Sequence, residues 1–102
     1  MNIGKAIKIC RIRKSMRQSE LAALAEISTP YLSLLEQGKR DPNLSVLTAI
    51  SHGLDIPLSI LVFLATDNKE LKEISPELFE KLSVTALELV QASGNEAVTL
   101  SK

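Results

Sequence analysis

The chain has 102 residues, enough for one ordinary domain with a sizeable core and an appendage, which argues against two independent domains. Aromatic residues make up only 3% of the chain. Ala, Leu, Glu and Lys are abundant, so the composition predicts an all-α protein. With one His, one Cys and no Gly-rich phosphate loop, the chain shows no cluster of convergent polar groups. We therefore expect no enzyme, no catalytic residues, no cofactor and no metal site.

The charges are unevenly distributed along the chain. The formal net charge of zero, taken alone, argues against a nucleic-acid partner. However, residues 1–42 hold eight Lys and Arg against four acids, a net charge of +4, and the remainder holds four against eight, a net charge of −4. The charges could simply be scattered over solvated faces. We interpret the split instead as a basic DNA-binding head joined to an acidic assembly module.

Cysteine content and hydropathy indicate the compartment. Cys10 is the only cysteine, so no intrachain disulfide can form, and we interpret it as a small buried hydrophobe rather than a redox sensor. Lys5 and Lys8 interrupt any apolar run near the start, so no signal peptide is visible. The longest apolar stretch, 56–65, contains Pro57 and is far shorter than the ~20 residues of a membrane-spanning helix. We expect a soluble, cytoplasmic protein with no membrane partner.

The first predicted helix spans about residues 3–14 and has two apolar faces. Ile7 and Cys10 belong to the face that points to the core, whereas Ile9 and Ile12 lie roughly opposite. Two apolar residues on the outer face of an otherwise basic helix suggest a covered surface. We hypothesise that the C-terminal helix, from this subunit or its partner, packs on Ile9 and Ile12. Full exposure of both would contradict this.

Residues 18–38 are predicted to form two short helices joined by a tight turn, which is a helix-turn-helix. Apolar residues of the first helix recur at i, i+3, i+4 spacing. The second helix should span about 29–37, because Ser28 is a suitable N-cap, Pro30 lies in the first turn and Gly38 stands where a helix ends in a left-handed conformation. Its N-terminal half is left facing outward, and such a half is what enters a DNA major groove.

Two more helices should complete the head. Asn43 caps the first, which ends at Gly53 and whose inner stripe is expected to include Leu44 and Ile50. The second, at about 58–65, is apolar nearly all round, so it must be buried on more than one side. One side can close the core. The other needs either the C-terminal helix or a second subunit, and this is the main reason why we predict a homodimer.

The C-terminal region is predicted to hold one more helix. Residues 66–74 are polar and read as a linker, Ser75 starts a helix that extends to about residue 92, and 95–102 should be a mobile tail. The apolar face of this helix has no room in a complete five-helix head. It should pack on the 58–65 helix or on the dimer mate, or, as a further alternative, bind another protein. The candidate packing and dimer residues are Leu61, Phe63, Leu64, Phe79, Leu82 and Val90.

Residues 3 to about 64 carry a series of residues at fixed spacing: Ile3-Gly4, Ile7, Arg11, Gln18, Glu20-Leu21-Ala22, Ser28, Tyr31-Leu32-Ser33, Glu36, Gly38-Lys39, Pro42, Leu47 and Ile50. This series resembles the XRE family of lambda-repressor-like and Cro-like regulators, and it is a far stronger signal than a lone short motif. The resemblance implies a five-helix lambda-repressor-like DNA-binding head, here with an additional C-terminal helix. It also implies a structural ion pair between Arg11 and Glu36, and dimerisation through the 58–65 region.

Two residues depart from the family pattern. Glu26 stands at the turn position that the family usually gives to Gly, and a non-Gly residue with positive φ there costs about 1 kcal/mol or somewhat more. Either Glu26 bears that strain or the turn is slightly different. Arg17 stands where the family usually has a Ser or Thr N-cap, so the chain loses a cap and gains a cation that can reach a phosphate.

The candidate DNA contacts separate affinity from specificity. Phosphate contacts are expected from Gln18, whose side-chain amide or backbone N–H often serves this way in the family, and from Arg17, Ser28, Lys39 and Arg40. The outward half of the second motif helix lacks Arg, Gln and Asn, so strong bidentate base pairings are missing there. Specificity should therefore lean on half-site spacing, DNA shape and apolar contacts to thymine. The base or groove candidates are Thr29, Pro30, Tyr31, Ser33 and Leu34, although Tyr31 and Leu34 could merely pack within the head.

These patterns together predict a sequence-specific, double-stranded DNA-binding transcriptional regulator, acting as a homodimeric repressor at a pseudo-palindromic operator. The alternative is an antitoxin-type interaction protein, whose C-terminal helix binds a protein partner while the head autoregulates. An apolar groove left exposed on residues 75–92 would favour that alternative. We expect the DNA-binding domain at 1–66, and the linker, the C-terminal packing helix and the tail at 67–102.

Overall fold

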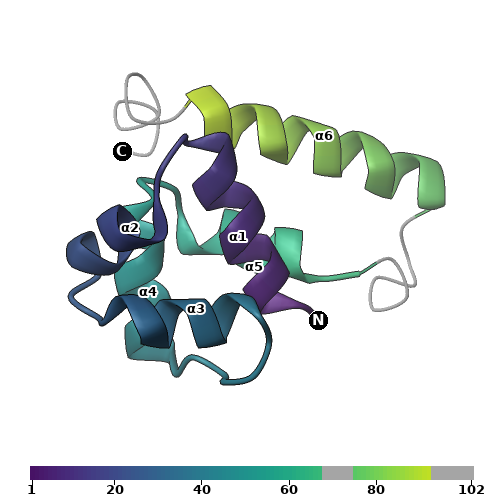
Figure 1. The fold of residues 1–102 in the computed structure, drawn as a ribbon. Helices are drawn as coiled ribbons and strands as arrows, with labels where there is room; N and C mark the ends of the chain where they lie inside the picture. Colours follow the sequence, from purple (N-terminus) through teal and green to yellow (C-terminus); the bar gives the residue numbers. More distant parts are fainter. Residues whose placement is uncertain (68–74, 93–102) are drawn as a thin grey trace.

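The computed structural model describes residues 1–67 and 75–92. These residues form helices without any strand, as the composition predicted (Figure 1). Most of the predicted linker and the whole predicted mobile tail lie outside the described residues. The helices are α1 (Ile3–Arg13), α2 (Gln18–Leu24), α3 (Thr29–Glu36), α4 (Leu44–Gly53), α5 (Leu58–Ala65) and α6 (Pro76–Ala92).

The predicted helix starts at Ser28, Asn43 and Ser75 are confirmed. The side-chain oxygens of Ser28 and Asn43 accept hydrogen bonds from the backbone N–H groups three residues later, over 3.1 and 2.8 Å, and that of Ser75 does so over 3.2 Å. These bonds satisfy N–H groups that have no partner within their own helix. At the other ends, α1 and α3 each stop one residue earlier than predicted, with Lys14 and Gln37 as C-caps.

Four helices end with a left-handed residue directly after the C-cap. These residues are Ser15, Glu26, Gly38 and Asp55, with φ of 57°, 57°, 76° and 56°. After α2, the N–H of Ile27 donates to the carbonyl oxygen of Ala22 over 3.0 Å, and that of Glu26 to Ala23 over 3.2 Å, which is a Schellman motif. Of the two alternatives for the turn, the structure shows that Glu26 adopts the strained conformation.

Replacing Glu26 with glycine is expected to raise the free energy of unfolding by about 0.5–1 kcal/mol, because glycine adopts positive φ without the Cβ clash. Glu26→Ala is the matched control, since it removes the same exposed carboxylate and keeps the Cβ. Denaturant unfolding of the three proteins measures the effect. An equal stability of the glycine and alanine variants would show that the turn stores no strain.

The core lies between α1 and the other helices of the head, and one residue of α6 joins it. Ile7, Leu21, Leu35 and Leu61 are fully buried there, and so is Val90 of α6. Contact between α1 and α3 is close, because a Cβ on Gly4 would collide with the carbonyl oxygen of Leu35. The head therefore forms one packed unit that holds α3 firmly from behind.

One residue expected in this core lies outside it. Leu44 is 70% exposed, so its predicted place in the inner stripe of α4 is wrong. Leu44 is the first residue of α4, and the buried residues of this helix, Ile50 and Ser51, lie in its second half. Leu44 thus lies past the edge of the core, whereas Val46 and Leu47 of the same turn still pack against it.

Burial governs the chemistry of Cys10. Its side chain is fully buried, and desolvation raises the pKa of the thiol to about 11, although Lys14 and Arg13 oppose this. Because the thiolate is the reactive form, the folded protein at pH 8 should not react with a thiol-specific disulfide reagent, whereas the denatured protein should react at once. Labelling followed by mass measurement tests this. Rapid labelling of the folded protein would contradict the buried, inert role predicted for Cys10.

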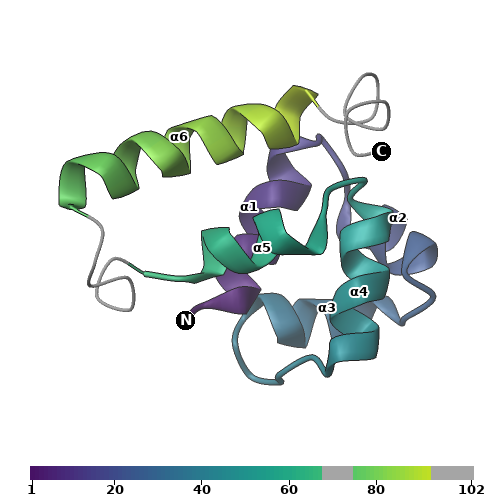
Figure 2. The same cartoon turned by 180° about the vertical axis from the view of Figure 1, so that it is seen from behind.

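Helix α6 packs on α1 and α5, on the side of the head opposite α3, and both views show this arrangement (Figures 1 and 2). The rings of Phe63 and Phe79 lie 5.8 Å apart between centroids. The guanidinium of Arg13 donates to the side-chain oxygen of Gln91 over 2.8 Å. The predicted packing of the C-terminal helix on the apolar α5 is therefore present within one chain.

The hypothesis of a covered outer face on α1 is only half right. Ile9 is half-buried, but Ile12 is 55% exposed, so the prediction is wrong for Ile12. Contact between α1 and α6 is made at Arg13, and Ile12 points about 100° away from Arg13 around the helix. Ile12 therefore remains on an exposed side of α1.

Among the described residues, no single helix is both long and apolar enough to cross a membrane. Helices α4 and α5 reach that length and composition only as a pair, and the pair is bent by 108°.

Candidate nucleic-acid interface

Helices α2 and α3 form the predicted helix-turn-helix, and its apolar residues are turned inward. Leu21 of α2 and Leu32 of α3 are fully buried. The opposite face of α3 is open, because Thr29 and Pro30 are exposed and Ser33 is half-exposed. The first turns of α3 therefore offer a hydroxyl, a methyl group and a proline ring to an outside partner.

The two remaining base candidates are partly held by the head. Tyr31 is half-buried and packs against the core. Leu34 is also half-buried, but it does not belong to the side chains packed on the core cluster. Packing thus accounts for part of Tyr31, whereas Leu34 keeps an apolar surface beside Pro30 and Ser33 on α3.

The candidate phosphate contacts lie on exposed positions before and after α3. Arg17, Ser28, Lys39 and Arg40 are all exposed. Ser28 uses its oxygen to cap α3, which leaves its O–H free to donate. Cations and helix N–H groups placed around an open helix face are the groups that bind DNA phosphates.

Arg17 takes part in the start of α2 through its backbone, because its side chain forms no cap hydrogen bond there. Its own side chain cannot cap α2, because a guanidinium has no acceptor. Instead, the backbone N–H of Arg17 donates to Glu20 Oε1 over 2.8 Å, which is the reciprocal half of a capping box. This bond, ahead of the nearby Arg17 charge, lowers the pKa of Glu20. The guanidinium also lies 3.3 Å from Glu20 Oε1, and an exposed pair of this kind can open when a phosphate approaches.

Arg11 and Glu36 meet as a two-pronged ion pair below α3. Arg11 Nε lies 2.7 Å from Glu36 Oε2, and Arg11 Nη2 lies 3.0 Å from Glu36 Oε1. Arg11 Nη1 donates to the carbonyl oxygen of Met16 over 2.8 Å. The carboxylate is almost fully buried, with 2% of its side chain exposed. The pair therefore ties α1 to the end of α3 from the inner side of the interface.

Gln18 completes this network. Its side-chain amide donates to Glu36 Oε1 over 3.0 Å, which links the first residue of α2 to the last residue of α3. The amide carries a second N–H, and the backbone N–H of Gln18, in the first turn of α2, has no acceptor within its own helix. Gln18 can thus brace the motif and still face a phosphate.

Two contacts at the interface were not predicted from the sequence. The Arg40 guanidinium lies 5.5 Å from the ring centroid of Tyr31, so the loop after α3 brings an Arg beside the reading helix that itself has none. The amide of Gln37 donates to Ser33 Oγ over 2.9 Å along the open face of α3. Four-residue spacing of Ser33 and Gln37 on a helix could have suggested the second contact, whereas the first depends on the path of the loop.

The predicted packing residues fall into two groups. Leu61 and Val90 are fully buried, and Phe63, Leu64 and Phe79 are half-buried in the contact between α5 and α6 or beside the core. Leu82 is different, because it is 40% exposed. Within one chain, therefore, α6 covers part of the apolar surface and leaves another part open.

A helix-turn-helix whose second helix is braced from behind, open in front and flanked by cations defines the class of a DNA-binding head. Residues 7–61, more than half of the chain, match the Helix-turn-helix family HTH_3. The chain belongs to this XRE-type helix-turn-helix family of DNA-binding transcriptional regulators.

Similar proteins carry regulator names. The chain is 36% identical over 62 residues to the immunity repressor protein of Bacillus phage phi105, covering 61% of this chain and 43% of that protein. It is 30% identical over 60 residues to the transcriptional regulator ClgR of Mycobacterium tuberculosis, covering 59% and 54%. With the HTH-type transcriptional regulator DdrOP3 of Deinococcus deserti it shares 31% identity over 62 residues, covering 61% and 48%. The chain thus spans about half the length of these curated relatives.

Proposed function

We propose that this protein is a sequence-specific transcriptional repressor that binds double-stranded DNA in the cytoplasm as a homodimer at a pseudo-palindromic operator. The open face of α3 carries the proposal, because Thr29 and Pro30 are exposed at the start of a helix that is fixed from behind by the pair of Arg11 and Glu36. The name of the phage relative, an immunity repressor, supports repression over activation. We assign DNA binding to residues 1–66 and dimer formation to the C-terminal helix at about 75–92.

Affinity for DNA comes from contacts to the phosphates of the DNA backbone. Arg17, Lys39 and Arg40 lie exposed around α3 and neutralise phosphates, and Ser28 and the backbone N–H of Gln18 donate to phosphate oxygens at helix starts. Each neutralised phosphate releases counterions, so binding weakens steeply with salt.

Specificity comes from a small set of contacts to base edges. Thr29 and Ser33 donate or accept single hydrogen bonds, while Pro30 and Leu34 contact thymine methyl groups. Arg40, placed over the Tyr31 ring, holds a positive charge beside the groove, where it fixes the register of α3 without reading a base. The remaining sequence specificity depends on DNA shape and half-site spacing.

Selection from a pool of random duplexes with the purified protein tests the proposal, and it does not require the operator to be known. We expect recovery of an inverted repeat whose half-sites lie about 34 Å apart, or about one helical turn, since two recognition helices of a dimer enter successive major grooves. Recovery of a single half-site would support a monomeric reader. Recovery of no motif would contradict sequence-specific binding.

The antitoxin-type role remains the second candidate because of one observation. Leu78, Val84 and Leu89 of α6 are 48%, 52% and 47% exposed, so the C-terminal helix presents apolar surface to a partner. If this surface binds another protein, the purified protein should be a monomer alone and should bind its partner through α6. A stable homodimer that buries the same residues would exclude that role.

A further inference from the structure

Helix α6 carries a second apolar stripe beside the face that packs on the head. Leu78, Leu82 and Leu89 are 48%, 40% and 47% exposed, and together with Thr85 they are spaced by four, three and four residues. This is the spacing of core positions in a two-helix coiled coil. The inward-facing residues, such as Ala86 and Val90, lie about 100° further round the helix. The stripe thus runs along the flank of α6 and has no cover among the described residues.

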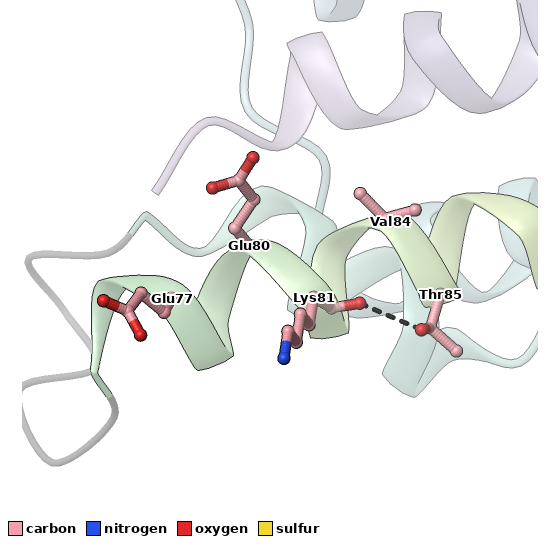
Figure 3. A pocket seen from close by; sticks show the side chains of 5 residues that line it. All are labelled: Glu77, Glu80, Lys81, Val84 and Thr85. Carbon is pink, nitrogen blue, oxygen red and sulfur yellow. Dashed lines mark hydrogen bonds between the residues drawn. The ribbon is translucent and has the colours of Figure 1, made fainter.

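The stripe is complementary to itself when two copies run in opposite directions. A two-fold axis that passes α6 midway between Leu82 and Thr85 places Leu78 against the partner's Leu89. The same axis places Leu82 against the partner's Thr85. The hydroxyl of Thr85 is already bonded to the Lys81 carbonyl oxygen over 2.9 Å, so Thr85 needs no polar partner in the seam (Figure 3).

The charges beside the stripe match the same arrangement. Lys81 and Glu88 immediately precede the seam residues Leu82 and Leu89, on the side away from the head, and neither forms an ion pair among the described residues. In an antiparallel pair each Lys81 faces the partner's Glu88, which gives two identical ion pairs. A parallel pair would instead place Lys81 against the partner's Ala86, which the head covers.

We propose that two copies of the chain associate through an antiparallel pairing of α6, with Leu78, Leu82 and Leu89 in the seam and reciprocal Lys81 to Glu88 ion pairs at its edge. The two-fold axis then passes between the two helices, perpendicular to both, roughly along the direction from α6 to the head. Both heads therefore lie on the same side of the paired helices. Since α3 lies at the far side of each head (Figures 1 and 2), both recognition helices are turned away from the pair, toward one DNA duplex.

This inference deepens the homodimer of the proposed function and rests on it. The seam covers 12 residues, about 18 Å of helix, so the dimer should be weak and concentration-dependent. Sedimentation over a range of concentrations measures its dissociation constant directly, with no DNA present.

Charge exchange tests the register. Lys81→Glu and Glu88→Lys should each raise the dimer dissociation constant by about tenfold, because two attractive contacts become repulsive. The double variant K81E/E88K should restore the wild-type dimer. Mixing the two single variants should yield a heterodimer in preference to either homodimer, since both ion pairs re-form. Glu80→Lys is the matched control, as Glu80 points to a different side of α6 from Lys81 (Figure 3), and should leave the dimer unchanged.

The outcomes separate this inference from the proposed function. A wild-type protein that is monomeric at all concentrations, or a dimer insensitive to both charge reversals and to Leu82→Glu, would overturn the antiparallel seam. DNA binding measured on the same samples is independent of that result. A monomer that still prefers its selected half-site would support the regulator function and exclude the antiparallel dimer. Rescue of the dimer by charge exchange in a protein that does not bind DNA would support the antiparallel dimer and exclude the regulator function.

Discussion

Replacing Glu36 with alanine should lower the free energy of unfolding by about 3 kcal/mol or more, because the guanidinium of Arg11 would stay in a largely buried site without its carboxylate. Gln18 would lose its acceptor as well. For a domain of this size the melting temperature should fall by roughly 12 °C or more. Thermal unfolding at fixed protein concentration measures the loss.

The double variant R11A/E36A distinguishes a stranded charge from simple loss of packing. If the cost of each single change arises from the surviving partner, the double variant should be clearly less destabilised than the sum of the two. Strict additivity of the single effects would contradict the role of Arg11 and Glu36 as one structural unit.

The second large effect is expected on DNA binding. Thr29→Glu should reduce affinity for the selected duplex by about 100-fold or more, because it places a carboxylate in the groove of each half-site, and a loss of about 1.4 kcal/mol at each of the two half-sites gives that factor. The fold should persist, since Thr29 is exposed and an acid in the first turn of a helix is favourable. Fluorescence anisotropy measures the affinity, and circular dichroism checks the fold.

Ser59→Glu is the matched control for this variant. It adds the same charge to an exposed position in the first turn of α5, and α5 packs on α1, α4 and α6 rather than on α3. Its affinity for DNA should remain close to that of the wild type. Equal losses in both variants would mean that net charge, and not the face of α3, controls binding.

Local signals allowed most of the fold to be predicted from the sequence. Ser28, Asn43 and Ser75 cap helices through bonds to backbone groups three residues away, so their effect depends on neighbouring residues alone. The Schellman turn at Glu26 is equally local. Helix order and the helix-turn-helix followed from such signals together with apolar spacing.

Exposure and loop contacts were harder to predict because they depend on distant parts of the chain. Leu44 and Ile12 are apolar and correctly spaced, yet both are exposed. Leu44 lies beyond the edge of the core, and α6 does not cover Ile12. The approach of Arg40 to Tyr31 depends on the loop that follows α3. Spacing alone states which side chains share a face, but only the packed helices determine which faces are covered.

One measurement tests most directly whether the chain is the proposed dimeric, sequence-specific DNA-binding protein. Binding of the purified protein to its selected duplex and to a scrambled duplex should be compared at two salt concentrations, alongside the molecular mass in solution. We expect a dimer that strongly prefers the selected duplex and loses affinity as salt rises, by about one power of the salt concentration for each neutralised phosphate. Equal affinity for both duplexes would contradict sequence-specific binding. An affinity that does not change with salt would contradict binding through DNA phosphates.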